Sequence, residues 1–181
     1  MFTEKQLDRE KVFSGKIVDV YHDKVALPDG REALREVCEH PGAVAILALD
    51  GEDMLFVRQY RHAVLAELLE VPAGKLEKGE DPFEAAKREL AEECGLVAEH
   101  YTDLGEFYPT VGYCSEIIYT WMATGLTPCA MHLDEDEFLT PEKLPFAEAV
   151  AMVLDGRIKD GKTVAAILKI DALRRRKAAE Q

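Results

Sequence analysis

The chain has 181 residues, of which 48% are hydrophobic and 31% charged, and its formal net charge is −13. This length suits one domain with a sizeable core, and the composition is ordinary for a soluble globular protein. The acidic surface repels nucleic-acid backbones and anionic membranes, so we expect neither as a partner. No apolar run approaches the roughly 20 residues of a membrane span, and the charged N-terminus has no signal-peptide core.

The cysteines show neither CxxC pairing nor a spacing typical of metal ligands. They are Cys38, Cys94, Cys114 and Cys129. We therefore expect free thiols and a cytoplasmic protein, because a reducing compartment keeps such cysteines unpaired.

The first sixty residues have the pattern of β-strands. Apolar residues alternate over residues 13–27, residues 28–31 form a predicted hairpin turn, and the return strand is expected at 35–38. Residues 43–49 are a short continuous apolar run, which is typical of a buried strand, and another strand is expected at 54–60.

The middle of the chain predicts a helix with clear ends. Asp81 is placed to cap it, Pro82 suits its first position, and Gly95 suits a left-handed stop. A β-branched and aromatic strand is expected at 117–123.

Two amphipathic helices are expected to close the chain, one from near Pro145 to before Gly156 and one from near Lys162. The order strands, helix, strands, helices predicts an α/β fold with a mixed sheet packed between helices.

The predicted helix after Asp81 carries an unusual concentration of acidic residues. They are Glu84, Glu89, Glu92 and Glu93. Like charges three or four residues apart destabilise a helix, so a cation among them is expected, and oxygen ligands suit a hard divalent ion. The alternative is a solvated acidic helix with salt bridges. The preceding turn at 72–74 can direct backbone carbonyls at the acidic face.

The segment fits the pattern G-x5-E-x7-R-E-U-x-E-E-x-G-U, where U is aliphatic, without a gap or substitution. The matching residues are Gly74, Glu80, Arg88, Glu89, Leu90, Glu92, Glu93, Gly95 and Leu96. This pattern resembles the Nudix box of the Nudix hydrolases. The resemblance implies an α/β/α sandwich with a mixed sheet and, ahead of it, an N-terminal antiparallel strand region.

Segments flanking the box look like the ADP-ribose pyrophosphatase branch of that family. They are residues 35–44, 58–61, 70–74, 108–113 and 160–163. The resemblance implies hydrolysis of ADP-ribose to AMP and ribose 5-phosphate with magnesium by a homodimer. It also implies that residues 1–40 form the dimer, and that residues 41–181 are the Nudix hydrolase domain within one folded unit.

The same resemblance implies roles for the residues of the box. Two or three Mg²⁺ ions are implied, which Mn²⁺ can replace, and their leading ligands are Glu89, Glu93 and the carbonyl of Ala73. Glu92 is the next candidate as a metal ligand, and it is also a candidate catalytic carboxylate. Gly74 and Gly95 are structural members of the motif.

Arg88 is expected to orient the carboxylates near Glu80 and Glu92 rather than to touch substrate. Glu80 is expected to anchor the loop before the helix.

Substrate contacts are implied outside the box. Arg61 is expected at the diphosphate, whereas Arg58 is either a second contact or part of a surface salt bridge. Arg35 is a candidate for the partner subunit's site. Glu116 either holds a ribose hydroxyl or is a solvated carboxylate at a strand end.

The general base is expected on the acidic loop at 133–138, where Glu137 or Glu135 could take a proton from water. The alternative is a merely solvated acidic run. Two other functions remain open: hydrolysis of a different substrate such as GDP-mannose or NADH, and, from another class, a sensor that binds ADP-ribose without cleaving it.

Overall fold

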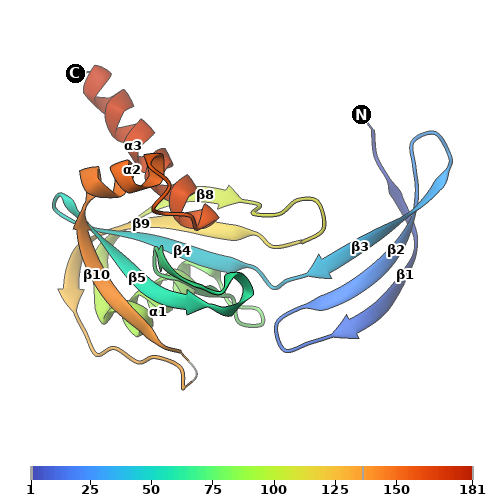
Figure 1. Cartoon of the computed structure of the whole chain (residues 1–181), viewed down its shortest axis with the longest axis horizontal. Coiled ribbons are helices and arrows are strands. Elements are labelled where there is room, and N and C mark those ends of the chain that lie inside the picture. Colours follow the sequence, from blue (N-terminus) through green and yellow to red (C-terminus); the bar gives the residue numbers. More distant parts are fainter. Residues whose placement is uncertain (1, 136, 181) are drawn as a thin grey trace. The chain divides into compact units, whose positions relative to one another are not determined.

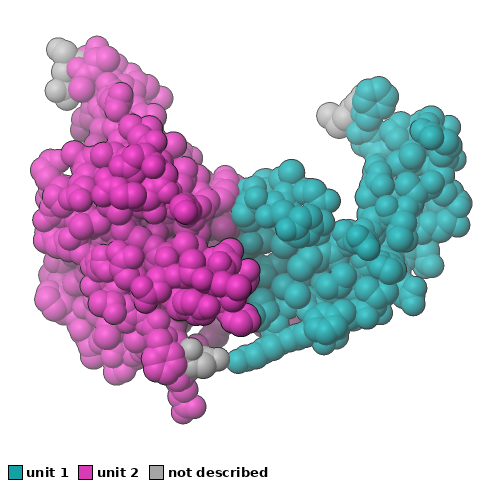
Figure 2. Space-filling model, in the orientation of Figure 1, with its two compact units in different colours: residues 1–42, 108–117 teal, residues 43–107, 118–181 magenta. Residues whose placement is uncertain are grey.

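A computed structural model describes residues 2–135 and 137–180, and the chain divides into two compact units. Unit 1 comprises the chain up to Gly42 together with Tyr108–Ile117, and unit 2 comprises Ala43–Phe107 and Ile118 onwards (Figure 2). No helix within the described residues is long and apolar enough to cross a membrane.

Unit 1 is built on a three-stranded antiparallel sheet in the order β1-β2-β3. The strands are β1 (Lys5–Ser14), β2 (Asp19–Ala26) and β3 (Glu32–Glu39). A turn closed by the hydrogen bond from Gly15 N to Val18 O joins β1 to β2. The expected continuous strand over 13–27 is therefore interrupted at 15–18, whereas the expected turn at 28–31 does join β2 to β3.

The sheet of unit 1 has little core of its own. Every residue of β1 is exposed, and the apolar side chains exposed in this unit include Leu7, Val12, Phe13, Ile17 and Leu34. A sheet normally needs an apolar face buried against another layer to be stable. Unit 1 therefore has apolar surface available for another protein surface.

Unit 2 contains a seven-stranded mixed sheet. Five of its strands follow the order β10-β5-β4-β9-β8, and of the other two, β6 pairs with β5 and β7 pairs with β4. Its strands are β4 (Ala43–Asp50), β5 (Asp53–Arg61), β6 (Ala66–Glu70), β7 (Ala73–Lys75), β8 (Leu96–Phe107), β9 (Ile118–Pro128) and β10 (Leu139–Pro145). A short 3₁₀ turn, η1 (His62–Val64), follows β5. The pair β4–β9 is parallel and the other pairs are antiparallel.

Three helices cover the two faces of this sheet: α1 (Pro82–Cys94), α2 (Phe146–Leu154) and α3 (Gly161–Ala179) (Figure 1). Because successive strand residues point to opposite faces, β4 contributes to two cores. Val44, Ile46 and Ala48 pack with α1, whereas Leu47 and Leu49 pack with α2 and α3. These layers confirm the expected α/β/α sandwich with a mixed sheet.

Candidate active site

Helix α1 begins and ends where the sequence predicts. The Asp81 side chain accepts hydrogen bonds from Phe83 N at 2.9 Å and Glu84 N at 3.3 Å, and Pro82 is the first helical residue. Gly95 has φ +61° and donates its N–H to Ala91 O at 3.0 Å, a left-handed stop that glycine adopts without steric cost. These caps fix which glutamates face the sheet.

Glu89 and Glu93 lie one turn apart on the buried face of α1. Glu89 is 8% exposed and Glu93 is 1% exposed. Burial raises the pKa of Glu89 to about 7, against the opposing effect of Arg88. Burial likewise raises the pKa of Glu93 to about 8, although its Oε2 accepts a 2.8 Å hydrogen bond from Ala73 N. Two carboxylates are thus held where an added cation would be favourable.

Gly74 allows this buried carboxylate pair to approach the β7 backbone. A Cβ at position 74 would lie 1.8 Å from Glu89 Oε1 and 1.9 Å from Glu89 Cδ, which no atom can occupy. The glycine of the motif is therefore required by the position of Glu89 rather than by a left-handed backbone.

Arg88 donates hydrogen bonds to three carboxylates of the motif. It donates two hydrogen bonds to Glu80, at 2.9 and 3.0 Å, and one each to Glu89 at 2.7 Å and Glu92 at 2.9 Å. Glu80 Oε2 also accepts from Glu77 N at 2.9 Å, which closes the loop before α1. Glu92 therefore faces the guanidinium, with 38% of its side chain exposed.

A second charged group surrounds Glu70, which ends β6 and has a side chain only 1% exposed. Arg61 donates to both carboxylate oxygens, at 2.7 and 2.8 Å, and Lys162 donates to Oε2. Lys162 Nζ is also 3.1 Å from Asp160, the N-cap of α3. The negative charge of Glu93 also contributes to raising the pKa of Arg61, so the two charged groups interact electrostatically.

Of the acidic loop residues, Glu137 carries a negative charge that contributes to raising the pKa of Glu89 and of Glu93. Burial raises the pKa of Glu137. Glu135 is exposed, and Asp136 lies outside the described residues.

Two sequence profiles match the chain. The NUDIX domain matches residues 39–167, and the nucleoside diphosphate sugar hydrolase N-terminal domain matches residues 4–38. The chain belongs to the Nudix family.

Two bacterial relatives match this Nudix protein over most of both chains. A methanol dehydrogenase activator of Bacillus methanolicus is 43% identical and covers 92% of this chain and 92% of its own. An ADP-ribose pyrophosphatase of Bacillus subtilis (strain 168) is 40% identical and covers 91% of this chain and 90% of its own.

The Nudix fold is also found in a solved structure described as an ADP compounds hydrolase. That structure has a TM-score of 0.85 and 23% sequence identity, and the match covers 96% of this chain and 95% of the other. At this identity the match establishes the shared fold.

The other expected substrate contacts of the Nudix protein form pairs with side chains of their own unit. Arg58 is paired with Glu142 on β10, donating to both carboxylate oxygens. In unit 1, Arg35 binds Glu4, with its Nε 3.0 Å from Oε2, and Glu116 Oε1 lies 3.7 Å from His40 Nδ1. These three side chains already have protein partners.

The donor set of this Nudix site fits a hard divalent cation. Glu89 and Glu93 provide carboxylate oxygens, and their raised pKa values reflect the cost of burying negative charge. Within residues 2–135 and 137–180, no group of three or more His, Cys, Asp or Glu side chains is arranged to hold a metal ion. A backbone carbonyl, water and substrate oxygens would have to complete the coordination.

Lys162 is the site residue that the sequence reasoning missed. The segment Asp160-Gly161-Lys162-Thr163 is one of the flanks that resemble the ADP-ribose pyrophosphatase branch, but the resemblance assigns Lys162 no role. The segment also carries a capping pattern, in which Asp160 Oδ2 accepts from Thr163 N at 3.0 Å. This pattern predicts the start of α3, but the contact with Glu70 joins residues 92 positions apart.

Gly74→Ala is expected to lower turnover at least tenfold with little loss of stability. The new methyl group would displace the Glu89 carboxylate, the mobile end of a side chain, rather than a backbone segment. Steady-state hydrolysis and thermal unfolding measure the two effects. Gly112→Ala is the matched control, because a Cβ there meets nothing within 4 Å. Wild-type turnover in Gly74→Ala would show that hydrolysis does not require the close packing of Glu89 against residue 74.

Glu70→Gln is expected to destabilise the protein by roughly 2 kcal/mol. Breaking a buried ion pair costs about 3–5 kcal/mol. A smaller loss is expected here, because the Arg61 side chain is 40% exposed and Lys162 keeps its ion pair with Asp160 in the variant. Urea unfolding measures the difference, and Glu67→Gln on the same strand, where Glu67 is exposed, is the control.

The effect of Glu70→Gln is expected to depend on pH. Burial alone would raise the pKa of Glu70, but the hydrogen bonds and charges of Arg61 and Lys162 outweigh it, so the pKa lies below its ordinary value of 4.5. A carboxyl group whose pKa is lower in the folded than in the unfolded protein stabilises the fold at pH values above its unfolded-state pKa. This stabilisation is lost as the pH falls towards the folded-state pKa. The difference between wild type and variant should therefore shrink below about pH 4.5, and an undiminished difference at pH 3 would contradict the ion-pair explanation.

Proposed function

We propose that the protein is a magnesium-dependent pyrophosphohydrolase that splits ADP-ribose into AMP and ribose 5-phosphate. The observation that carries this proposal is the buried pair Glu89 and Glu93 beside the cationic Arg61, in a chain with a complete Nudix box. The 40% identity to the Bacillus subtilis ADP-ribose pyrophosphatase supports the substrate.

In this proposal, Glu89, Glu93 and the carbonyl of Ala73 hold Mg²⁺, with Mn²⁺ as a substitute. When bound, the metal offsets the charge of the diphosphate and makes a bound water more acidic. Two or three ions are proposed, because one cation cannot balance several carboxylates and a diphosphate. Glu92 is proposed to join the ligands by exchanging its contact with Arg88 for a metal.

The general base is proposed to be Glu137 rather than Glu135. Two observations support this choice. The charge of Glu137 contributes to raising the pKa of both buried glutamates, and burial raises the pKa of Glu137 itself towards the range in which a carboxylate accepts a proton efficiently. Glu137 would remove the proton from the attacking water while the diphosphate is held in place.

Arg61 is proposed to bind the diphosphate. It forms a two-point contact with Glu70, and a diphosphate oxygen pair offers the same geometry. If Arg61 moves from Glu70 to substrate, Lys162 remains on Glu70, so no buried carboxylate is left unpaired. Arg58 is a weaker candidate, because releasing it would break its two hydrogen bonds to Glu142.

Unit 1 is proposed to form a homodimer through residues 1–40, with residues 41–181 as the hydrolase domain. The exposed apolar side chains of β1 and β3, such as Leu7 and Leu34, support this proposal. Arg35 and Glu116 would then serve the partner subunit's site.

Product analysis tests the proposed reaction. The protein is incubated with ADP-ribose, GDP-mannose or NADH and Mg²⁺, and the nucleotides are separated by anion-exchange chromatography. We expect AMP and ribose 5-phosphate from ADP-ribose at the highest rate. A tenfold preference for another substrate would refute the substrate assignment. Stoichiometric ADP-ribose binding without AMP release would identify a sensor instead.

A further inference from the structure

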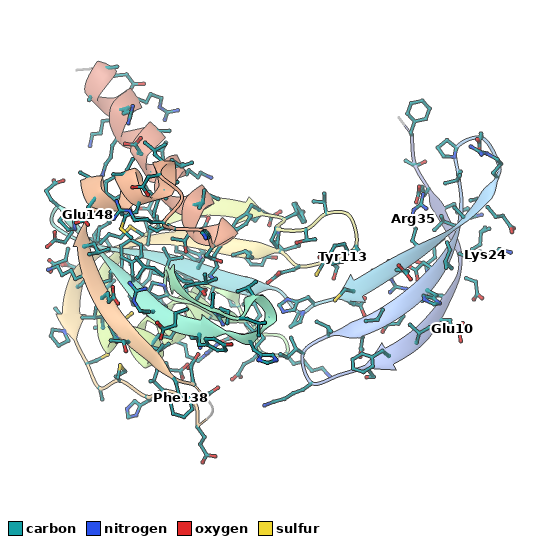
Figure 3. The ribbon with its side chains drawn as sticks, in the orientation of Figure 1. Glu10, Lys24, Arg35, Tyr113, Phe138 and Glu148 are labelled. Atoms are coloured by element: carbon teal, nitrogen blue, oxygen red, sulfur yellow. The ribbon has the colours of Figure 1, made fainter. Side chains whose placement is uncertain are left out.

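Two of the four cysteines lie side by side in unit 1. Cys38, on β3, and Cys114, on the loop that joins β8 to β9, form a parallel β-bridge. The backbone contact has two hydrogen bonds, from Cys38 N to Tyr113 O at 2.6 Å and from Ser115 N to Cys38 O at 2.9 Å. Figure 3 labels Tyr113 on this loop. The hydrogen bonds fix positions 38 and 114 as direct partners.

The geometry of this bridge suits a disulfide. Neighbouring strands lie about 4.7–4.9 Å apart, which falls within the Cα separation of about 4.4–6.8 Å that disulfides span. The Cys114 thiol contributes to raising the pKa of the Cys38 thiol, as expected for close neighbours, and both side chains are half-buried. The backbone separation at this bridge therefore permits a bond between the two sulfur atoms.

We propose that Cys38 and Cys114 are a site of reversible disulfide formation, with a low-molecular-weight disulfide such as oxidised glutathione as the oxidant. The thiolate of one cysteine attacks the oxidant, releases one glutathione thiol and leaves a mixed disulfide. The second cysteine then attacks the protein sulfur of that bond and releases the other glutathione. The two protein thiols lose two electrons and two protons, and one oxidised glutathione becomes two thiols.

The disulfide covalently fixes the loop 108–117 to β3. In the reduced protein this attachment depends on the two backbone hydrogen bonds and on the donation from His40 N to Ser115 Oγ at 3.0 Å. Burial raises the pKa of the Cys38 thiol, which keeps it mostly protonated at neutral pH and makes the oxidation slow. The reduced and oxidised forms should therefore be separable on the bench.

The remaining cysteines provide matched controls. Cys94 lies on α1, where burial raises its pKa to about 12, and Cys129 is exposed just after β9. Cys129 N donates to Gly95 O at 2.8 Å, so the backbones at 95 and 129 are also neighbours. A disulfide between Cys94 and Cys129 is therefore the alternative pairing that an experiment must distinguish.

Peptide mapping of the full chain distinguishes the two pairings. The protein is treated with oxidised glutathione, free thiols are blocked with N-ethylmaleimide, and the product is digested without reduction by trypsin and Glu-C. Cleavage after Glu93, Glu99 and Glu116 places Cys94, Cys114 and Cys129 in separate peptides. We expect a cross-linked peptide pair containing Cys38 and Cys114, which dithiothreitol separates.

Thermal unfolding provides a second measurement that needs no substrate, so it does not depend on the proposed hydrolase activity. Oxidation should raise the unfolding midpoint by roughly 5 °C or more, because the bond closes a long loop in the unfolded chain. The variant Cys94→Ser/Cys129→Ser should keep both the cross-link and the shift, whereas Cys38→Ser and Cys114→Ser should each lose both. Complete labelling of Cys38 and Cys114 after oxidation, or a cross-link between Cys94 and Cys129 alone, would overturn the proposal.

Discussion

Glu93→Gln is expected to lower kcat for ADP-ribose at least a hundredfold while leaving the fold intact. The amide keeps an oxygen that can accept the hydrogen bond from Ala73 N, so the contact between α1 and β7 survives. It removes one of the two buried carboxyl groups that can ionise when a cation binds, and a neutral amide is a weaker ligand for a hard cation than a carboxylate. The loss should therefore appear in turnover and in Mg²⁺ affinity.

Steady-state kinetics at several Mg²⁺ concentrations, with thermal unfolding in parallel, measure this effect. Glu84→Gln is the matched control, because Glu84 lies on the same helix, is exposed and forms an ion pair with Lys87. Near wild-type turnover in Glu93→Gln at low Mg²⁺ would refute the ligand assignment. Equal losses in both variants would point to the charge of the helix as a whole.

Removal of residues 1–40 is expected to abolish hydrolysis and to yield a monomer. The residues of both cores in unit 2 come from position 43 onwards, so the remaining chain keeps its buried contacts. The deletion removes Arg35, and it also removes the backbone of Cys38, which holds the loop 108–117. Inactivity would then reflect the lost strands rather than a collapsed core.

Light scattering coupled to size exclusion compares the truncated protein with the full chain of 20.2 kDa, which we expect to elute at twice that mass. A full-length companion variant, Leu34→Glu, places a charge on an exposed apolar position of β3 and should weaken the dimer. Arg157→Gln, which alters an exposed pair with Asp155, is its surface control. An active truncated monomer would contradict the proposed role of unit 1.

The parts of the fold that the sequence predicts well have local causes. Helix α1 is bounded by Asp81 and Gly95, whose effects act within one turn, and β4 is a continuous apolar run that is buried throughout except at its last residue. The strand β1 has no such local signal, and only the family resemblance implies strands in this region. Its sequence KQLDREKVFS is exposed along its whole length, so no apolar alternation marks it.

The residues of the candidate site likewise fall into those that local sequence predicts and those that it does not. Glu89, Glu93 and Gly74 are visible from the spacing of the motif, because helix geometry and a nearby turn bring them together. The pairs Arg58–Glu142 and Lys162–Glu70 join residues 84 and 92 positions apart. Sequence spacing alone carries no information about such partners, since they meet only when the sheet and the last helix assemble.

The double role of β4 has a consequence for engineering this protein. Its even-numbered residues Val44 and Ile46 support the glutamate helix, and its odd-numbered residues Leu47 and Leu49 support the C-terminal helices. Replacements that raise heat tolerance can therefore be sought at Leu47 and Leu49 with least disturbance to catalysis, whereas Ala45 pairs with Ala73 on β7. Libraries aimed at altered chemistry belong at Val44 and Ile46.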